Sequence, residues 1–130
     1  MQAASAIGRP IPDRTGAAIV VSKAVVRAAA ILGLTNAGLA KVLGLSPASA
    51  SRLRDGSYVL TPDSKPYELA VLLIRLFRGL DAMIGGEEQA ARSWMETANR
   101  ALDGAPIERI TSVTGLVETV AYVDAARARV

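Results

Sequence analysis

The sequence contains no cysteine and no histidine, and aromatic residues make up only 4% of its 130 residues. Without cysteine there are no disulfides or thiolate nucleophiles, and without histidine there are no Ser/His/Asp triads. The two absences together remove nearly all zinc and other transition-metal sites. The Asp and Glu residues form no spaced catalytic pair or metal cluster, and no phosphate-binding loop occurs. We therefore expect a protein that is not an enzyme and that needs no cofactor and no metal.

The sequence also lacks a charge-free apolar run of the roughly 20 residues that a membrane span needs. Charged residues interrupt both of its most apolar segments. Lys23 and Arg27 lie within the segment 17–34, and Arg75, Arg78 and Asp81 lie within the segment 69–84. The first ten residues lack the basic start and apolar block that are typical of a secretion signal. These features predict a soluble, cytoplasmic protein with no membrane partner.

What the sequence does contain is enough apolar material for a core. It is 51% hydrophobic and 21% charged, which excludes a disordered chain. The net charge of +3 is unevenly distributed: residues 1–56 carry seven basic and two acidic side chains, and the remainder carries eight basic and ten acidic ones. The basic end suits a polyanion such as nucleic acid, although a split of this size also occurs on ordinary solvated surfaces.

The spacing of apolar residues predicts helices from about residue 17 onward. Residues 1–14, which contain Gly8, Pro10 and Pro12, are expected to be a flexible lead-in. A first helix, with Ala17, Val21, Ala24, Val25, Ala28, Ile31 and Leu32 on its apolar face, should end at Gly33. Two short helices follow. The first is capped by Thr35 or Asn36 and closed by Gly44; the second starts at Ser46-Pro47 and ends at Asp55-Gly56.

The segment 57–65 is predicted to be a loop and the boundary between two halves. A strongly amphipathic helix is expected at 69–84. Its wide apolar face suggests that it packs on two sides, either inside both halves of the chain or across a dimer. The alternative is that it is a single core element. Further helices are expected near 87–98 and 106–111. A last helix should follow Thr114-Gly115, with an inner stripe of Leu116, Val117, Val120 and Ala121. No segment has a convincing strand pattern, so the fold class is all-α, with domains at 15–63 and 64–130.

Residues 36–55 have the pattern of a helix-turn-helix. This motif needs a small residue where its helices cross, a flexible residue at the turn and buried apolar residues around both. Ala40 and Gly44 meet the first two requirements, and the inner set consists of Leu39, Leu43, Leu45, Ala50 and Leu53. The motif resembles that of the phage-repressor-like regulators.

If the second helix of the motif enters the major groove, its outward side chains contact DNA. Arg52 is placed to form a bidentate pair with guanine, whereas Lys41 and Arg54 are placed to hold phosphates. The predicted DNA-binding residues are Lys41, Ser46, Ala48, Ser49, Ser51, Arg52 and Arg54. A single copy reads too few base pairs, so a functional regulator should bind a two-fold operator as a homodimer. The alternative is a motif that keeps its fold and binds DNA weakly or not at all.

The second half, taken with this motif, resembles the Xre/MbcA/ParS antitoxins. Their C-terminal domain has a Trp, then Asn-x-x-Leu-x-Gly-x-x-Pro, then a Gly-Val-like pair that opens a final helix. The matching residues here are Trp94, Asn99, Leu102, Gly104, Pro106 and Gly115. The chain departs from the pattern by one residue between Gly104 and Pro106, and Leu116 stands where Val is usual. Each matching residue also has a structural interpretation: Trp94 as a core anchor, Asn99 as a cap, and Gly104 with Pro106 as a turn.

The resemblance implies an all-α protein in which a phage-repressor-like helix-turn-helix bundle is followed by a small helical toxin-binding domain. It also implies a partner, a RES-domain toxin that degrades nicotinamide adenine dinucleotide and whose site the antitoxin's C-terminal part obstructs. The surface left for toxin binding comprises Tyr122, Asp124, Arg127, Arg129 and Val130. The tail 125–130 lies at the toxin site in this hypothesis and is a frayed terminus in the alternative. A stand-alone dimeric helix-turn-helix transcriptional regulator is the alternative function.

Overall fold

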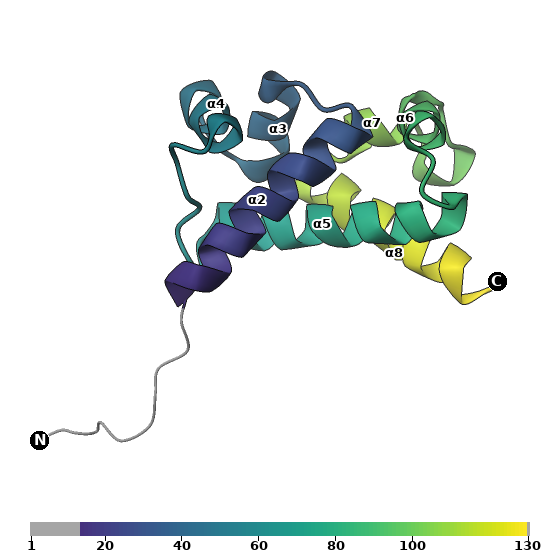
Figure 1. Ribbon diagram of the computed structural model, residues 1–130. Helices are drawn as coiled ribbons and strands as arrows, with labels where there is room; N and C mark the ends of the chain where they lie inside the picture. The colour runs from purple at the N-terminus through teal and green to yellow at the C-terminus, as the bar shows by residue number, and fades with distance from the viewer. Residues whose placement is uncertain (1–13, 130) are drawn as a thin grey trace, which may run out of the picture.

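The computed structural model describes residues 14–129 and folds them into helices (Figure 1). In chain order the elements are α2 (Arg14–Leu32), α3 (Asn36–Leu43), α4 (Pro47–Asp55), α5 (Lys65–Ile84), α6 (Glu88–Glu96), the 3₁₀ turn η1 (Arg100–Leu102), α7 (Pro106–Arg109) and α8 (Val113–Ala128). The described residues contain no strand, only an isolated antiparallel bridge between Asn99 and Gly104. The all-α prediction is therefore confirmed, whereas the predicted lead-in lies, except for Arg14, outside the described residues.

Local sequence signals set the ends of the first helices. The Thr35 hydroxyl accepts a hydrogen bond from the Gly38 N–H at 3.0 Å, which caps α3. Ser46 caps α4, and Pro47 follows in the first turn, where its missing N–H costs nothing. Gly44 ends α3 in the left-handed conformation, with φ of 69°. These boundaries agree with the sequence prediction.

Helix α5 is the central element of the core. It packs against α2 and α3 from the first half and against α6 and α8 from the second. Its inner residues are buried, including Leu69, Leu73, Leu76 and Leu80, and they join one core cluster with residues from both halves. In Figure 1 α5 runs the length of the molecule and α2 crosses it. Of the alternatives for this helix, packing inside both halves is the one observed.

Helix α2 is unusually apolar. Its stretch Thr15–Leu32 has a mean hydropathy of 1.7 and is long enough to span a membrane by length and composition, a test that core helices of soluble proteins also pass. Val25, Ala29 and Leu32 are completely buried in the core cluster. Ala17, which the apolar spacing placed inside, is exposed, and its neighbour Ala18 is buried instead.

The last helix differs from the prediction in its start and in its buried face. α8 begins at Val113, with Ser112 as the cap that accepts a hydrogen bond from the Gly115 N–H at 3.0 Å. Gly115 thus lies inside the first turn rather than before it. Leu116 and Val120 are buried as expected, but Val117 is 48% exposed and Ala121 is also exposed. The buried face is completed by Thr119 and Val123, because α8 is apolar on several sides and its spacing alone does not select one of them.

Candidate functional site

The first candidate site is the pair α3 and α4, which form a helix-turn-helix. Ala40 is buried, and its carbonyl accepts a hydrogen bond from the Leu45 N–H, in the turn between the two helices, at 2.9 Å. The left-handed Gly44 makes the turn between them. Leu39, Leu43, Ala50 and Leu53 are buried and Leu45 is half-buried, so the predicted inner set holds the two helices to the core. The geometry leaves one side of α4 facing solvent.

Hydrogen bonds organise the beginning of α4. The Ser46 hydroxyl accepts a hydrogen bond from the Ser49 N–H at 3.1 Å and donates to the Ser49 hydroxyl at 3.0 Å. Arg52 Nη2 donates to the same Ser49 oxygen at 3.4 Å. Arg52 is otherwise exposed, so its guanidinium keeps donors free for a ligand beyond the helix. This row of hydroxyl and guanidinium groups can donate to and accept from base edges and phosphates.

Most of the predicted DNA-binding residues are accessible in the structure. Lys41, Ser46, Ala48, Ser51 and Arg52 are exposed, and Ser49 is half-buried. Arg54 is different, because its Nη2 donates to the Leu34 carbonyl at 3.1 Å and its Nε is buried without a hydrogen-bond partner among the described residues. Arg54 therefore ties α4 to the segment that follows α2 instead of projecting freely from the surface.

The carboxylate of Asp55 accepts hydrogen bonds at the C-terminal end of α4. Asp55 Oδ1 accepts hydrogen bonds from the Ser57 hydroxyl at 2.6 Å and from the Ser57 N–H at 2.9 Å. These bonds, followed by the positive charge of Arg52, hold the pKa of Asp55 below its ordinary value of 3.8. The ionised side chain thus stabilises the turn after α4. The sequence predicted that α4 ends here but not that Asp55 has this role.

The second candidate site is the surface of the C-terminal half. Tyr122 is half-buried and stacks on Trp94, with ring centroids 6.4 Å apart and an interplanar angle of 26°. Asp124 accepts a charge-assisted hydrogen bond from Arg75 at 2.6 Å. Both side chains, predicted as toxin contacts, therefore also make contacts within the fold. Arg127 and Arg129 are exposed at the end of α8, and Val130 lies outside the described residues.

An arginine that the sequence did not single out joins the two halves. Arg92 of α6 donates from Nη2 to the Ala30 carbonyl at 3.0 Å and from Nε to the Ile31 carbonyl at 3.3 Å. Its side chain also lies over Gly33, which ends α2. The positive charge thus stabilises the C-terminal end of α2, which carries a partial negative charge. No sequence signal marks this contact, because the partners lie about sixty residues apart.

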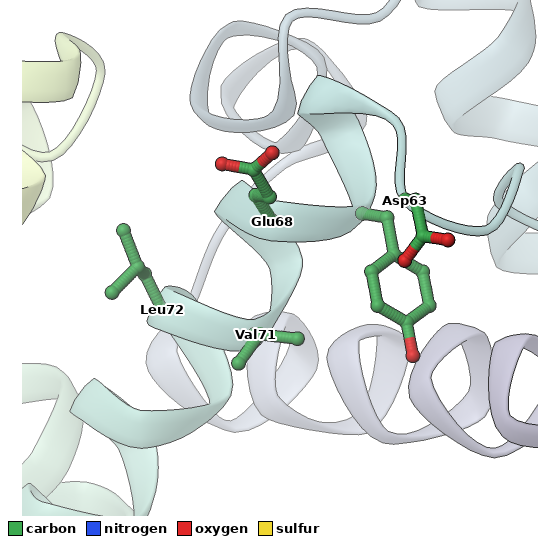
Figure 2. A pocket seen from close by; sticks show the side chains of 5 residues that line it. Asp63, Glu68, Val71 and Leu72 are labelled. Carbon is green, nitrogen blue, oxygen red and sulfur yellow. The ribbon is translucent and has the colours of Figure 1, made fainter.

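A surface pocket lies at the start of α5. Figure 2 shows Asp63, Glu68, Val71 and Leu72 around a pocket at the start of α5, with a volume of about 380 Å³. Its lining combines two carboxylates and the phenol of Tyr67 with two apolar side chains, and it includes no nucleophile paired with a base. Within residues 14–129, no group of His, Cys, Asp and Glu side chains has the arrangement of a metal site. The residues that line this pocket thus do not form a catalytic arrangement.

Two family models match the chain. The antitoxin Xre-like helix-turn-helix domain matches residues 12–75, which include α2, α3 and α4. The antitoxin Xre/MbcA/ParS C-terminal toxin-binding domain matches residues 79–129, so the two matches cover most of the chain and adjoin within α5. A comparison with curated proteins found no match. The chain belongs to the Xre/MbcA/ParS antitoxins, with a helix-turn-helix domain followed by a toxin-binding domain.

Proposed function

We propose that this antitoxin blocks a RES-domain toxin that degrades nicotinamide adenine dinucleotide and represses its own operon as a homodimer. The observation that carries the proposal is the order of its two domains, with a DNA-binding type of fold at 12–75 and a toxin-binding type at 79–129. Such a protein acts by binding rather than by catalysis. It works in the cytoplasm, where its operator and its toxin are both present.

The DNA-binding part of the proposal rests on α4. The exposed side of this helix carries Ser46, Ala48, Ser51 and Arg52, and its caps hold it in place. Arg52 is the residue suited to a bidentate pair with guanine O6 and N7. A single nine-residue helix contacts only a few base pairs, so useful specificity calls for two copies on a two-fold operator.

The toxin-blocking part rests on the end of α8. Arg127 and Arg129 are exposed there and make this end of the helix positively charged. Neither side chain forms an ion pair with an acidic residue within 14–129. In the proposal these guanidinium groups donate to carboxylates or backbone oxygens at the toxin site, and Val130 belongs to the same binding surface. Tyr122 and Asp124 contribute the adjoining surface, which is held in shape by Trp94 and Arg75.

Co-expression with the product of the adjacent open reading frame tests the proposal. The antitoxin should restore growth that this product arrests, should co-purify with it and should prevent the fall in cellular nicotinamide adenine dinucleotide. In a gel-shift assay it should also bind a two-fold sequence upstream of its own gene. Binding to that DNA together with failure to rescue growth or co-purify would instead support a stand-alone dimeric regulator.

A further inference from the structure

Two shallow pockets adjoin on the outer face of α5. One lies between α2 and α5 and the other between α5 and α8, each with a volume of about 370 Å³, and they share Ile74 and Arg78. We call these two adjoining pockets together the α5 groove. Its floor includes Ala24, Ile74 and Phe77, and its rim includes Lys23, Arg27, Arg78 and Arg127. The groove is therefore built by elements of both family domains.

The rim of the α5 groove is strongly positive. Lys23, Arg27, Arg78 and Arg127 are all exposed, and none of them has an ion pair within residues 14–129. The only acidic residue lining the two pockets, Asp124, is already paired with Arg75. Four positive charges thus surround the groove without compensation, although the net charge of the whole chain is only +3. A ligand with several negative charges would be attracted here.

The floor of the α5 groove is apolar and incompletely covered. Val71 is 44% exposed, and Ile74 and Phe77 are half-buried. On α2, Val20 lies one helical turn before Ala24 and is 67% exposed. Apolar surface of this kind, rimmed by charged residues, is typical of a surface that binds another protein.

The combination of rim and floor identifies the class of ligand. DNA phosphates would satisfy the rim but would leave the apolar floor uncovered. A second copy placed groove to groove would bring eight positive charges together without a compensating acidic residue. An amphipathic protein segment with Asp or Glu on both sides of an apolar stripe satisfies rim and floor together.

We propose that the α5 groove binds an acidic amphipathic segment of the toxin. The inference rests on the proposed antitoxin function and extends it, because Lys23, Arg27 and Arg78 lie outside the matched toxin-binding domain at 79–129. Toxin binding then spans both domains and includes α2, whose C-terminal end leads directly into the helix-turn-helix. A bound toxin would thereby hold α2, α5 and α8 against one another.

Charge reversal on the full-length chain tests the groove. The variants are Arg78→Glu, the double variant Lys23→Glu/Arg27→Glu and the control Arg100→Glu, an exposed cation of η1 that does not line the groove. Isothermal titration with a catalytically inactivated toxin from the adjacent gene gives the affinity of each. We expect each groove variant to bind roughly tenfold more weakly or worse, and the control to bind within about twofold of the wild type. The wild-type affinity should also fall more steeply with salt than that of the variants.

The outcomes separate the groove from the function on which it rests. If both groove variants bind the toxin as tightly as the wild type does, the groove proposal is overturned and the proposed antitoxin function is unaffected. Loss of operator binding without loss of toxin binding would overturn it in favour of a DNA surface. If the wild-type chain binds no toxin at all, both the groove proposal and the proposed function are overturned. Unfolding curves identical to the wild type confirm that any loss is not caused by misfolding.

Discussion

Gly115 provides a sharp test of how the toxin-binding domain is packed. A Cβ atom at this position would lie 1.8 Å from the Arg109 carbonyl oxygen and 2.7 Å from its carbon, where ordinary contacts are 3.4–4 Å. These are backbone atoms of the segment before α8, so no side-chain rotation relieves the overlap. Gly→Ala in an exposed helix normally stabilises by about 1 kcal/mol, and here we predict the opposite sign. The packing of α8 against α7 thus requires glycine at this position.

The predicted size of the effect follows from two losses. Overpacking at a rigid site costs about 1–3 kcal/mol, and displacement of Gly115 breaks the cap bond from its N–H to Ser112, which contributes about 1 kcal/mol more. We therefore expect Gly115→Ala to lower the free energy of unfolding by about 3 kcal/mol. The corresponding fall in melting temperature is roughly 10 °C for a chain of this size.

Urea unfolding followed by circular dichroism and by the fluorescence of Trp94, the only tryptophan, measures this change. Gly38→Ala in α3 is the matched control. Its Cβ would lie 3.3 Å from two side-chain atoms, of Leu34 and Thr35, and would cost less than about 1 kcal/mol because side chains can adjust. If Gly115→Ala proved as stable as the wild type, the packing of α7 against α8 described above would be wrong.

Three further predictions concern α4 and the tail. Arg52→Ala should weaken operator binding by about 1–3 kcal/mol in a gel shift at fixed salt, whereas Arg100→Ala should leave it unchanged. If both variants bind the operator equally well, Arg52 does not contact the DNA. Asp55 has a folded pKa below 3.8, so its hydrogen bonds stabilise the fold above about pH 4 and this contribution is lost as the pH falls through the lowered pKa. The free energies of unfolding of wild type and Asp55→Asn should therefore differ at pH 7 and converge in acid, and a difference independent of pH would contradict this role. Deletion of residues 125–130 should reduce toxin neutralisation in a growth assay and leave operator binding intact, and full neutralisation by the shortened chain would refute the role of the tail.

The sequence predicted well those features that depend on neighbouring residues. Gly33, Gly44 and Gly56 end their helices as expected, and Ser46 caps α4, because these effects act within one helical turn. The outward side of α4 was also predictable, since the apolar positions Ala50 and Leu53 fix which side is buried.

Features that depend on contacts between distant segments could not be predicted. Arg54 was expected to be available for phosphates, and its bond to the Leu34 carbonyl depends on how α4 lies against the end of α2. Val117 and Ala121 were expected inside, yet α8 has apolar residues on more than one side and only its packing on α5 selects the buried one. The groove between α2, α5 and α8 likewise exists only once the two halves are packed together.

Growth rescue by the full chain is the decisive measurement of antitoxin function. Cells would express the product of the adjacent open reading frame, with or without this antitoxin, and the growth rate would be measured. We expect arrest by that product alone and restored growth when the antitoxin is present. Equal arrest with and without the antitoxin, at matched expression, would contradict it.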